Sequence, residues 1–228
     1  PGPGKTVTLQ LRVEQLPAAG VPVFLADIKG DLAGLVEPAP DGNDRIADRV
    51  AATGIDWSPA ASPVRFWSLG GIGPGIPVRA TIDEFGPQLL AKVLGSNETQ
   101  ASSLSLVFHH ADQHDLALVD LVELQDLLRH LTSDVGRAEL KGIGGLSAQT
   151  AGVLLRDLVQ LEQQEGERFF GEPALSIESL LQVDEAGRGV ISCLELAAVQ
   201  DKPKLFSTFL MWLLAALLEE LPEVGDLD

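Results

Sequence analysis

Apolar runs and turn-forming residues alternate along the first 80 positions, and their spacing predicts both helices and strands. Residues 6–16 carry apolar side chains that one helix could bury, and Pro17 predicts the end of that helix. Residues 21–28 form a near-continuous apolar run, which is typical of a strand buried on both faces of a parallel sheet. A second strand is expected at residues 64–69 and a short helix at residues 44–53.

The next hundred residues have apolar positions at helical spacing, each set preceded by a residue suited to cap a helix. Thr81 and Asp120 are each followed three residues later by a glutamate, which is the spacing of a capping box, and Ser147 is a further N-cap candidate. The helices expected in this block cover residues 81–94, 97–111, 120–131, 147–161 and 177–181.

Strand character returns at residues 189–196, and a long apolar helix is expected over residues 203–221. The apolar run within that helix, LFSTFLMWLLAALL, has about 14 residues, whereas a membrane span needs about 20. We therefore expect a buried helix. The predicted fold class is α/β, with an α/β core at residues 1–80 and 186–228 and an inserted helical subdomain at residues 81–185.

Composition narrows the class of protein. Of the 228 residues, 45% are hydrophobic and 21% are charged, which excludes global disorder. The 33 acidic residues outnumber the 16 basic ones, and the net charge of −17 disfavours general binding to nucleic-acid backbones. A single cysteine, Cys193, excludes a disulfide framework and thiolate zinc sites.

The chain begins without methionine, its only methionine being Met211, and no basic segment followed by an apolar run opens it. We expect a piece of a longer cytoplasmic protein that has no secretory signal.

The opening residues carry the clearest candidate chemistry. Gly2, Gly4, Lys5 and Thr6 match the second half of a phosphate-binding P-loop, G-x-x-x-x-G-K-[ST]. In such a loop the glycine backbones cradle phosphate, the lysine reaches the β- and γ-phosphates, and the threonine hydroxyl binds Mg²⁺. The helix that starts here adds the positive end of its dipole. The first glycine of the motif would fall before residue 1.

An acidic residue ends the first predicted strand. Asp27 closes the run VFLAD, which has the apolar-run-plus-acid pattern of a Walker B strand, and it is a candidate for supporting contacts with the phosphate loop or Mg²⁺, together with Lys29. Asp83 and Glu84 imitate the same pattern less well, because Arg79 interrupts the apolar run and helix capping already explains Glu84.

Two other motifs are interpreted as structural. Residues 184–195 have the spacing of a calcium loop, but Ala186 and Arg188 supply no side-chain oxygen, so a turn entering a strand is expected. The histidines and acids at residues 109–115 could suggest a metal site, but His109, His110 and His114 lie in polar sequence at a helix end and are expected to be solvated. No nucleophile elbow supports Ser/His/Asp catalysis.

Several segments together resemble the HerA-like helicase C-terminal family, bacterial P-loop ATPases of the FtsK–HerA group. They are GKTVTLQ at Gly4, AGVPVFLADIKGDLAGL at Ala19, PVRFW at Pro63, PVRAT at Pro77, NETQ at Asn97, GRGVI at Gly187 and LLEELPEVGD at Leu217. The resemblance spans nearly the whole chain. It implies a RecA-like fold, ATP and Mg²⁺ as cofactors, ATP hydrolysis by the intact parent, helicase-like or translocase activity on DNA for that parent only, and a homo-oligomer.

Two departures from the family pattern lead to further expectations. The strand before the P-loop and the later strand with the Asp-Glu pair are both missing from the sequence, so no catalytic residue is expected within it. Without those strands we also expect unpaired edges on the strands at residues 21–28 and 189–196. The alternative function is a non-catalytic, acidic, helical protein-interaction module.

Overall fold

The computed structural model describes residues 5–40, 42–140 and 142–221, with side chains from residue 8 onward. The chain divides into two compact units. The first, called the sheet unit below, comprises Pro1–Trp67, Gly73–Gly75 and Glu178–Ala197. The second, called the helical unit, comprises Ser68–Ile72, Ile76–Ile177 and Ala198–Asp228.

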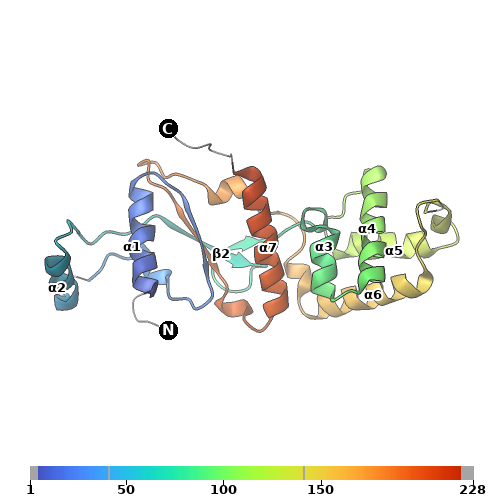
Figure 1. Cartoon of the computed structure of the whole chain (residues 1–228), viewed down its shortest axis with the longest axis horizontal. Helices are drawn as coiled ribbons and strands as arrows, with labels where there is room; N and C mark the ends of the chain where they lie inside the picture. Colours follow the sequence, from blue (N-terminus) through green and yellow to red (C-terminus); the bar gives the residue numbers. More distant parts are fainter. Residues whose placement is uncertain (1–4, 41, 141, 222–228) are drawn as a thin grey trace. The chain divides into compact units, whose positions relative to one another are not determined.

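The sheet unit alternates helices with strands (Figure 1). Its elements in chain order are α1 (Lys5–Ala18), β1 (Val23–Asp27), the short helix η1 (Ala33–Val36), α2 (Asp44–Thr53), the first part of β2 (Val64–Leu69) and β4 (Ile191–Glu195). The chain leaves the unit along β2, returns to it briefly at Gly73–Gly75, and returns again at Glu178, ahead of β4.

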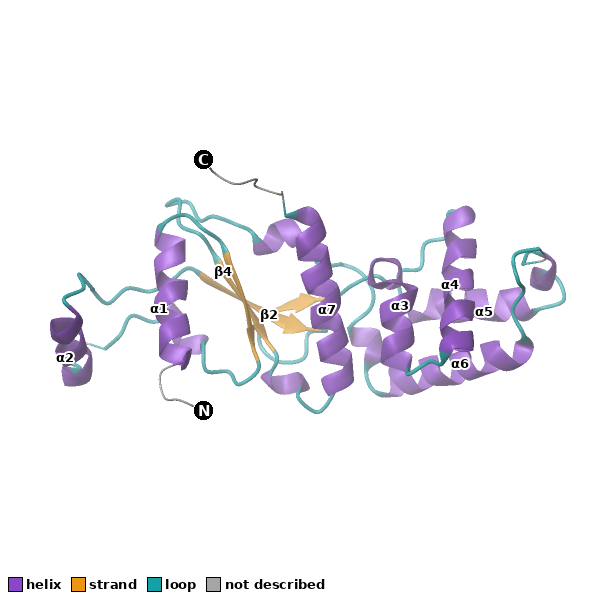
Figure 2. Cartoon of the chain, viewed as in Figure 1, coloured by secondary structure: helices purple, strands orange, loops and turns teal. Residues whose placement is uncertain are grey.

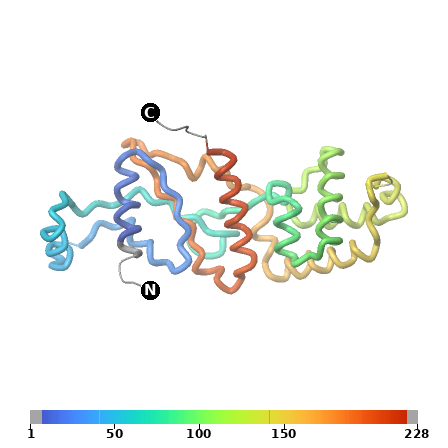
Figure 3. The backbone as a smooth tube through the Cα atoms, viewed as in Figure 1, coloured from blue at the N-terminus to red at the C-terminus, as the bar shows by residue number. Residues whose placement is uncertain are grey.

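The four strands form one parallel sheet in the order β1-β4-β2-β3, in which β3 is Ile76–Val78. Strands β1 and β4 pair in parallel from Val23 opposite Ile191 to Asp27 opposite Glu195. Figure 3 shows this pairing as a blue and an orange stretch of the tube that run side by side although they lie far apart in the sequence.

The position of β4 corrects one prediction. Residues 189–196 were expected to have an unpaired edge, but β4 lies between β1 and β2, and all five of its residues are buried. Strand β1 is an edge strand of the sheet. It is not buried on both faces, because Ala26 is exposed and Val23 and Phe24 are only half-buried.

The core of the sheet unit gathers apolar side chains from several elements. Val13 on α1 packs with Leu25 on β1 and with Ile191 and Cys193 on β4, and two leucines that follow β1 complete the cluster, Leu32 and Leu35. Helix α1 runs to Ala18 and includes Pro17, which was predicted to end it. Pro17 lies in the last turn, where its missing N–H removes only one hydrogen bond from the helix.

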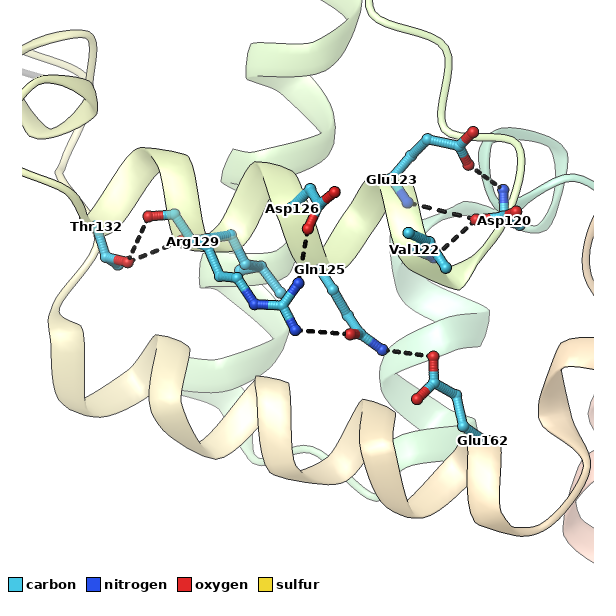
Figure 4. Close-up of polar contacts among 9 residues, drawn as sticks. Asp120, Val122, Glu123, Gln125, Asp126, Arg129, Thr132 and Glu162 are labelled. Carbon is cyan, nitrogen blue, oxygen red and sulfur yellow. Dashed lines mark hydrogen bonds and ion pairs between the residues drawn. The ribbon is translucent and has the colours of Figure 1, made fainter.

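The helical unit is built mainly from helices (Figure 2). They are α3 (Ile82–Leu94), α4 (Glu98–Gln113), α5 (Leu121–Thr132), α6 (Ala148–Gln163) and α7 (Pro203–Glu220). The predicted capping boxes are present: the Glu84 backbone N–H donates to Thr81 Oγ1 at 3.1 Å, and the Thr81 N–H donates to Glu84 Oε2 at 3.0 Å. Asp120 and Glu123 cap α5 in the same way (Figure 4).

A chain of polar contacts connects α5 to α6 (Figure 4). Arg129 Nη2 donates to Gln125 Oε1 at 3.0 Å, and Gln125 Nε2 donates to Glu162 Oε1 at 2.8 Å. The Gln125 side chain is buried, so these two bonds satisfy an amide that would otherwise destabilise the interface.

Helix α7 packs against α3 through aromatic side chains. Phe209 and Trp212 lie beside Phe85, and Trp212 Nε1 donates to the Glu84 carbonyl oxygen at 2.9 Å. The division into units accordingly places α7 in the helical unit. The domain limits at residues 80 and 185 stay a prediction. Among the described residues, no helix is both long and apolar enough to cross a membrane.

Candidate nucleotide-binding site

Helix α1 begins at the two residues that the P-loop pattern assigns to phosphate and Mg²⁺. Lys5 and Thr6 are its first residues, although their side chains are outside the described part, as are Gly2 and Gly4 altogether. The first N–H groups of a helix have no partner within it and attract anions. The first turn of α1 has no acidic residue, so no carboxylate there opposes a phosphate group.

Asp27, at the carboxyl end of β1, is the predicted supporting residue whose geometry is described. Its carboxylate accepts three backbone hydrogen bonds: Oδ1 from Lys29 N at 3.0 Å and from Gly30 N at 2.9 Å, and Oδ2 from Leu32 N at 2.8 Å. Only 4% of Asp27 is exposed. The carboxylate thus fixes the turn that follows β1, whereas the Lys29 side chain lies at the surface.

This turn lies along α1. Gln10 Nε2 approaches the Asp31 carbonyl oxygen at 3.5 Å, and Leu32 packs in the same core cluster as Val13. With a rise of about 1.5 Å per residue, Gln10 is only about 7.5 Å along the helix axis from Lys5. Asp27 therefore holds a loop that lies along the amino-terminal half of α1.

Glu195, the last residue of the calcium-loop pattern that was interpreted as structural, is a buried acid. It faces Asp27 in the register of β4 against β1 and is 8% exposed. Burial raises the pKa of the Glu195 carboxyl, and the nearby Asp27 charge raises it further. An acid at the end of an apolar strand run, LEL after VISC, was the available signal, but only the strand pairing reveals its neighbour.

Cys193 completes a compact group with these two acids. The three side chains each place one ligand atom within 4.8 Å of the others, and Cys193 Sγ donates to Glu195 Oε1 at 3.8 Å. Burial raises the pKa of the Cys193 thiol to about 12, and metal ions bind the thiolate form. Asp27 already accepts three N–H groups, so the donor set fits a structural role better than metal binding.

A cleft of about 600 Å³ also borders α1, but at its carboxyl-terminal part. Its lining includes Gln10, Glu14 and Pro17 from α1 and Trp57 from the segment after α2. Burial raises the pKa of Glu14. The α1 residues that line the cleft run from Gln10 to Ala18, beyond the first turn of the helix, where the P-loop pattern puts phosphate.

A comparison with known protein families identifies the family of the chain. The model of the family described as Helicase HerA-like C-terminal matches residues 1–228. The chain belongs to this family.

A solved structure supports the fold class expected for the family. The plasmid coupling protein TrwB, in complex with the non-hydrolysable ATP analogue ADPNP, superposes with a TM-score of 0.51 at 17% sequence identity. The match covers 99% of this chain and 52% of the TrwB chain, so the chain spans about half the length of that neighbour. The fold is thus of the RecA-like P-loop class, as predicted. No curated protein matches the chain.

The remaining acidic candidates have structural roles in the HerA-like chain. Asp83 Oδ2 accepts the Leu118 N–H at 2.7 Å, and Glu84 closes the cap of α3. Asp184 accepts the backbone N–H groups of Ala186 and Arg188 and pairs with the Arg188 side chain, which confirms the predicted turn.

The histidine cluster was predicted wrongly in part. His109 and His114 are exposed, but His110 is only 2% exposed and contacts Glu139. Glu139 is remote in the sequence, and its approach to α4 is the reason why the local polar pattern failed here.

Proposed function

We propose that the chain is the ATP-binding part of a HerA-like P-loop ATPase. Lys5 binds the β- and γ-phosphates, the Thr6 hydroxyl binds Mg²⁺, and the backbones of Gly2 and Gly4 cradle phosphate. The family match over the whole chain supports this proposal most strongly, and the start of α1 at Lys5 agrees with it. Helicase or translocase activity on DNA, and assembly into a homo-oligomer, are proposed for the parent protein only. The cytoplasmic location also stays a prediction.

Asp27 and Lys29 take supporting positions in this proposal. Asp27 holds the loop that follows β1 beside α1, and Lys29 is the one basic side chain on that loop. Bound Mg²⁺ would supply charge neutralisation at the β- and γ-phosphates.

The experiment that tests the proposal is nucleotide binding by the 228-residue chain. A fluorescent ATP analogue is titrated in the presence of Mg²⁺ and displaced with ADP. We expect Lys5→Ala to weaken binding at least tenfold, which is about 1.4 kcal/mol. Arg156→Ala is the matched control, since it removes one exposed positive charge in the helical unit. Equal binding by the wild type and Lys5→Ala would contradict the proposal.

Binding and hydrolysis are separable in this chain. Phosphoryl transfer depends on groups that orient the attacking water. Asp27 and Glu195 are the acids at the carboxyl ends of β1 and β4, and both are buried and already accept hydrogen bonds within the chain. We therefore expect ATP turnover at least 100-fold below about 1 s⁻¹, the lower end of the usual range for enzymes.

The interaction module is the second candidate, and the surface of α7 favours it. Met211, Leu214 and Leu218 are 45%, 55% and 78% exposed on this helix. Exposed apolar side chains at helical spacing are typical of protein contacts. A chain that binds no nucleotide but self-associates less in Leu214→Ser and Leu218→Ser variants would favour this function.

A further inference from the structure

Three histidines and one glutamate come together in the helical unit, where His110 is buried and the other three are exposed. His110 lies on α4, His114 caps the carboxyl end of that helix, His130 lies on α5, and Glu139 follows the short helix η2 (Gly136–Ala138). The group thus connects two helices with the segment that leaves α5. The proposed ATPase function makes no use of it.

Glu139 bridges two of the histidines. Its Oε1 lies 2.8 Å from His130 Nε2, and its Oε2 lies 3.3 Å from His110 Nε2. An ionised carboxylate only accepts hydrogen bonds, so both ring nitrogens donate to it. One side chain therefore holds the segment around η2 to both α4 and α5.

The His114 ring stacks on the His110 ring, with centroids 4.0 Å apart and planes inclined by 29°. His114 Nδ1 lies 2.8 Å from the His110 carbonyl oxygen, and a carbonyl oxygen accepts only, so Nδ1 carries a proton. The stacked arrangement leaves two rings in contact that would repel each other if both were charged.

The segment held by Glu139 packs closely on the end of α5. A Cβ atom on Gly136 would come within 2.2 Å of the His130 carbonyl oxygen, so only glycine fits there. The backbone N–H groups of the segment are hydrogen-bonded: Gly136 to Ser133 Oγ, Arg137 to the Ser133 carbonyl and Glu139 to the Gly136 carbonyl. Exchange of these amide protons with solvent therefore requires the segment to open.

Charge is disfavoured at His110 in the closed arrangement. Burial lowers the pKa of His110. The nearby His114 and His130 lower this pKa further, whereas Glu139 raises it. These three side chains are the titratable groups that act on it: His114 from α4 itself, His130 from α5 and Glu139 from the segment after η2. The Glu139 carboxyl has a lowered pKa, first through its hydrogen bond with His130.

We propose that His110, His130 and Glu139 form an acid-sensitive clamp that holds the segment around η2 closed at neutral pH and releases it as His110 becomes protonated. The direction in which pH shifts the opening of the segment follows from proton linkage. In the open state His110 is in water, with an ordinary pKa of about 6.5, and it binds a proton more readily than in the closed state. Acid therefore draws the segment open, below pH 6.5 and above the lower pKa of the closed state.

Amide hydrogen exchange on the 228-residue chain tests the clamp. The opening equilibrium constant is obtained for the amides of Gly136, Arg137 and Glu139, after correction for the intrinsic effect of pH on exchange. One linked proton changes an equilibrium constant by up to about tenfold per pH unit. We expect opening to increase by several-fold, up to about tenfold, between pH 7.5 and pH 5.5.

Two variants separate the clamp from general acid effects. His110→Gln keeps a side-chain donor for Glu139 but does not titrate, so its opening constant should be nearly the same at both pH values. His109→Gln removes the exposed neighbouring histidine and should keep the wild-type response. Equal pH responses of the wild type and His110→Gln would overturn the proposal.

A direct measurement keeps the proposal testable even if His110→Gln fails to fold. The ring resonances of the four histidines are followed by NMR in the wild-type chain as the pH is lowered. We expect His110 to titrate below the ordinary histidine value. Titration of His110 at or above the ordinary value of about 6.5 would overturn the clamp.

Discussion

Asp27 and Glu195 occupy facing positions at the carboxyl ends of two neighbouring parallel strands, and both are buried. Three backbone N–H groups stabilise the Asp27 carboxylate. Glu195 has only the weak donor Cys193 Sγ among its described contacts. Burial of the Glu195 carboxyl and the nearby charge of Asp27 both raise the pKa of Glu195.

This pairing makes the stability of the sheet unit depend on pH in a defined direction. The raised pKa of Glu195 means that the folded chain holds a proton that the unfolded chain releases above pH 4.5. Its contribution to stability is present below that pH and is lost as the pH rises through the folded pKa. We expect Glu195→Gln to remove this loss, so that urea unfolding shows the variant gaining on the wild type between pH 5 and pH 7.5. A constant difference between the two would contradict the assignment.

Asp27→Asn should destabilise the chain by about 2–3 kcal/mol. An asparagine keeps one acceptor oxygen, and its Nδ2 group would face a backbone N–H, so at least one hydrogen bond to a charged acceptor is lost. Denaturant unfolding measures the effect. Asp31→Asn, at an exposed position on the same loop, should change stability by less than about 0.5 kcal/mol.

Cys193 should be chemically inert in the folded chain. Its thiol is buried, and its pKa is raised to about 12. The thiolate is the reactive form, so a thiol reagent at pH 8 should modify the native chain far more slowly than the chain unfolded in urea. Because this is the only cysteine, the signal reports one site. Equal rates in both states would show that the strand β4 is open to solvent.

Alanine substitutions at two glycines should have opposite effects. A Cβ atom at Gly189 would lie 2.0 Å from the Val21 carbonyl oxygen and 2.6 Å from Pro22 N, both fixed backbone atoms. We expect Gly189→Ala to cost more than about 3 kcal/mol or to prevent folding of the sheet unit. At Gly152 in α6 the nearest atom is Arg156 Nη1 at 3.9 Å, and Gly152→Ala should stabilise the chain by about 0.5–1 kcal/mol. Thermal unfolding distinguishes the two outcomes.

Local signals in the sequence predicted most elements well. Helix α2 and strand β2 have the predicted bounds, and the caps of α3 and α5 are the predicted residues. In each case the signal and the structure it specifies lie within a few residues of one another. Strand β3 was missed because Ile76–Val78 is too short to show a periodic pattern between the glycines that precede it and Arg79.

Features that depend on distant residues could not be predicted. The interior position of β4, the pairing of Glu195 with Asp27 and the burial of His110 beneath Glu139 all arise from contacts between remote segments. The assignment of Lys5 and Thr6 to nucleotide binding comes from a motif, and it stays a prediction because their side chains are not described.

The parallel pairing of β1 with β4 also sets the order of folding. Helices α3 to α6 lie between Asp27 and Ile191, so the sheet unit cannot close until that long stretch of chain has been made. Contacts between residues so far apart form slowly, whereas the pairs α3–α4 and α5–α6 join neighbouring segments. During synthesis, α3 to α6 can therefore pack while β1 still waits for its partner strand.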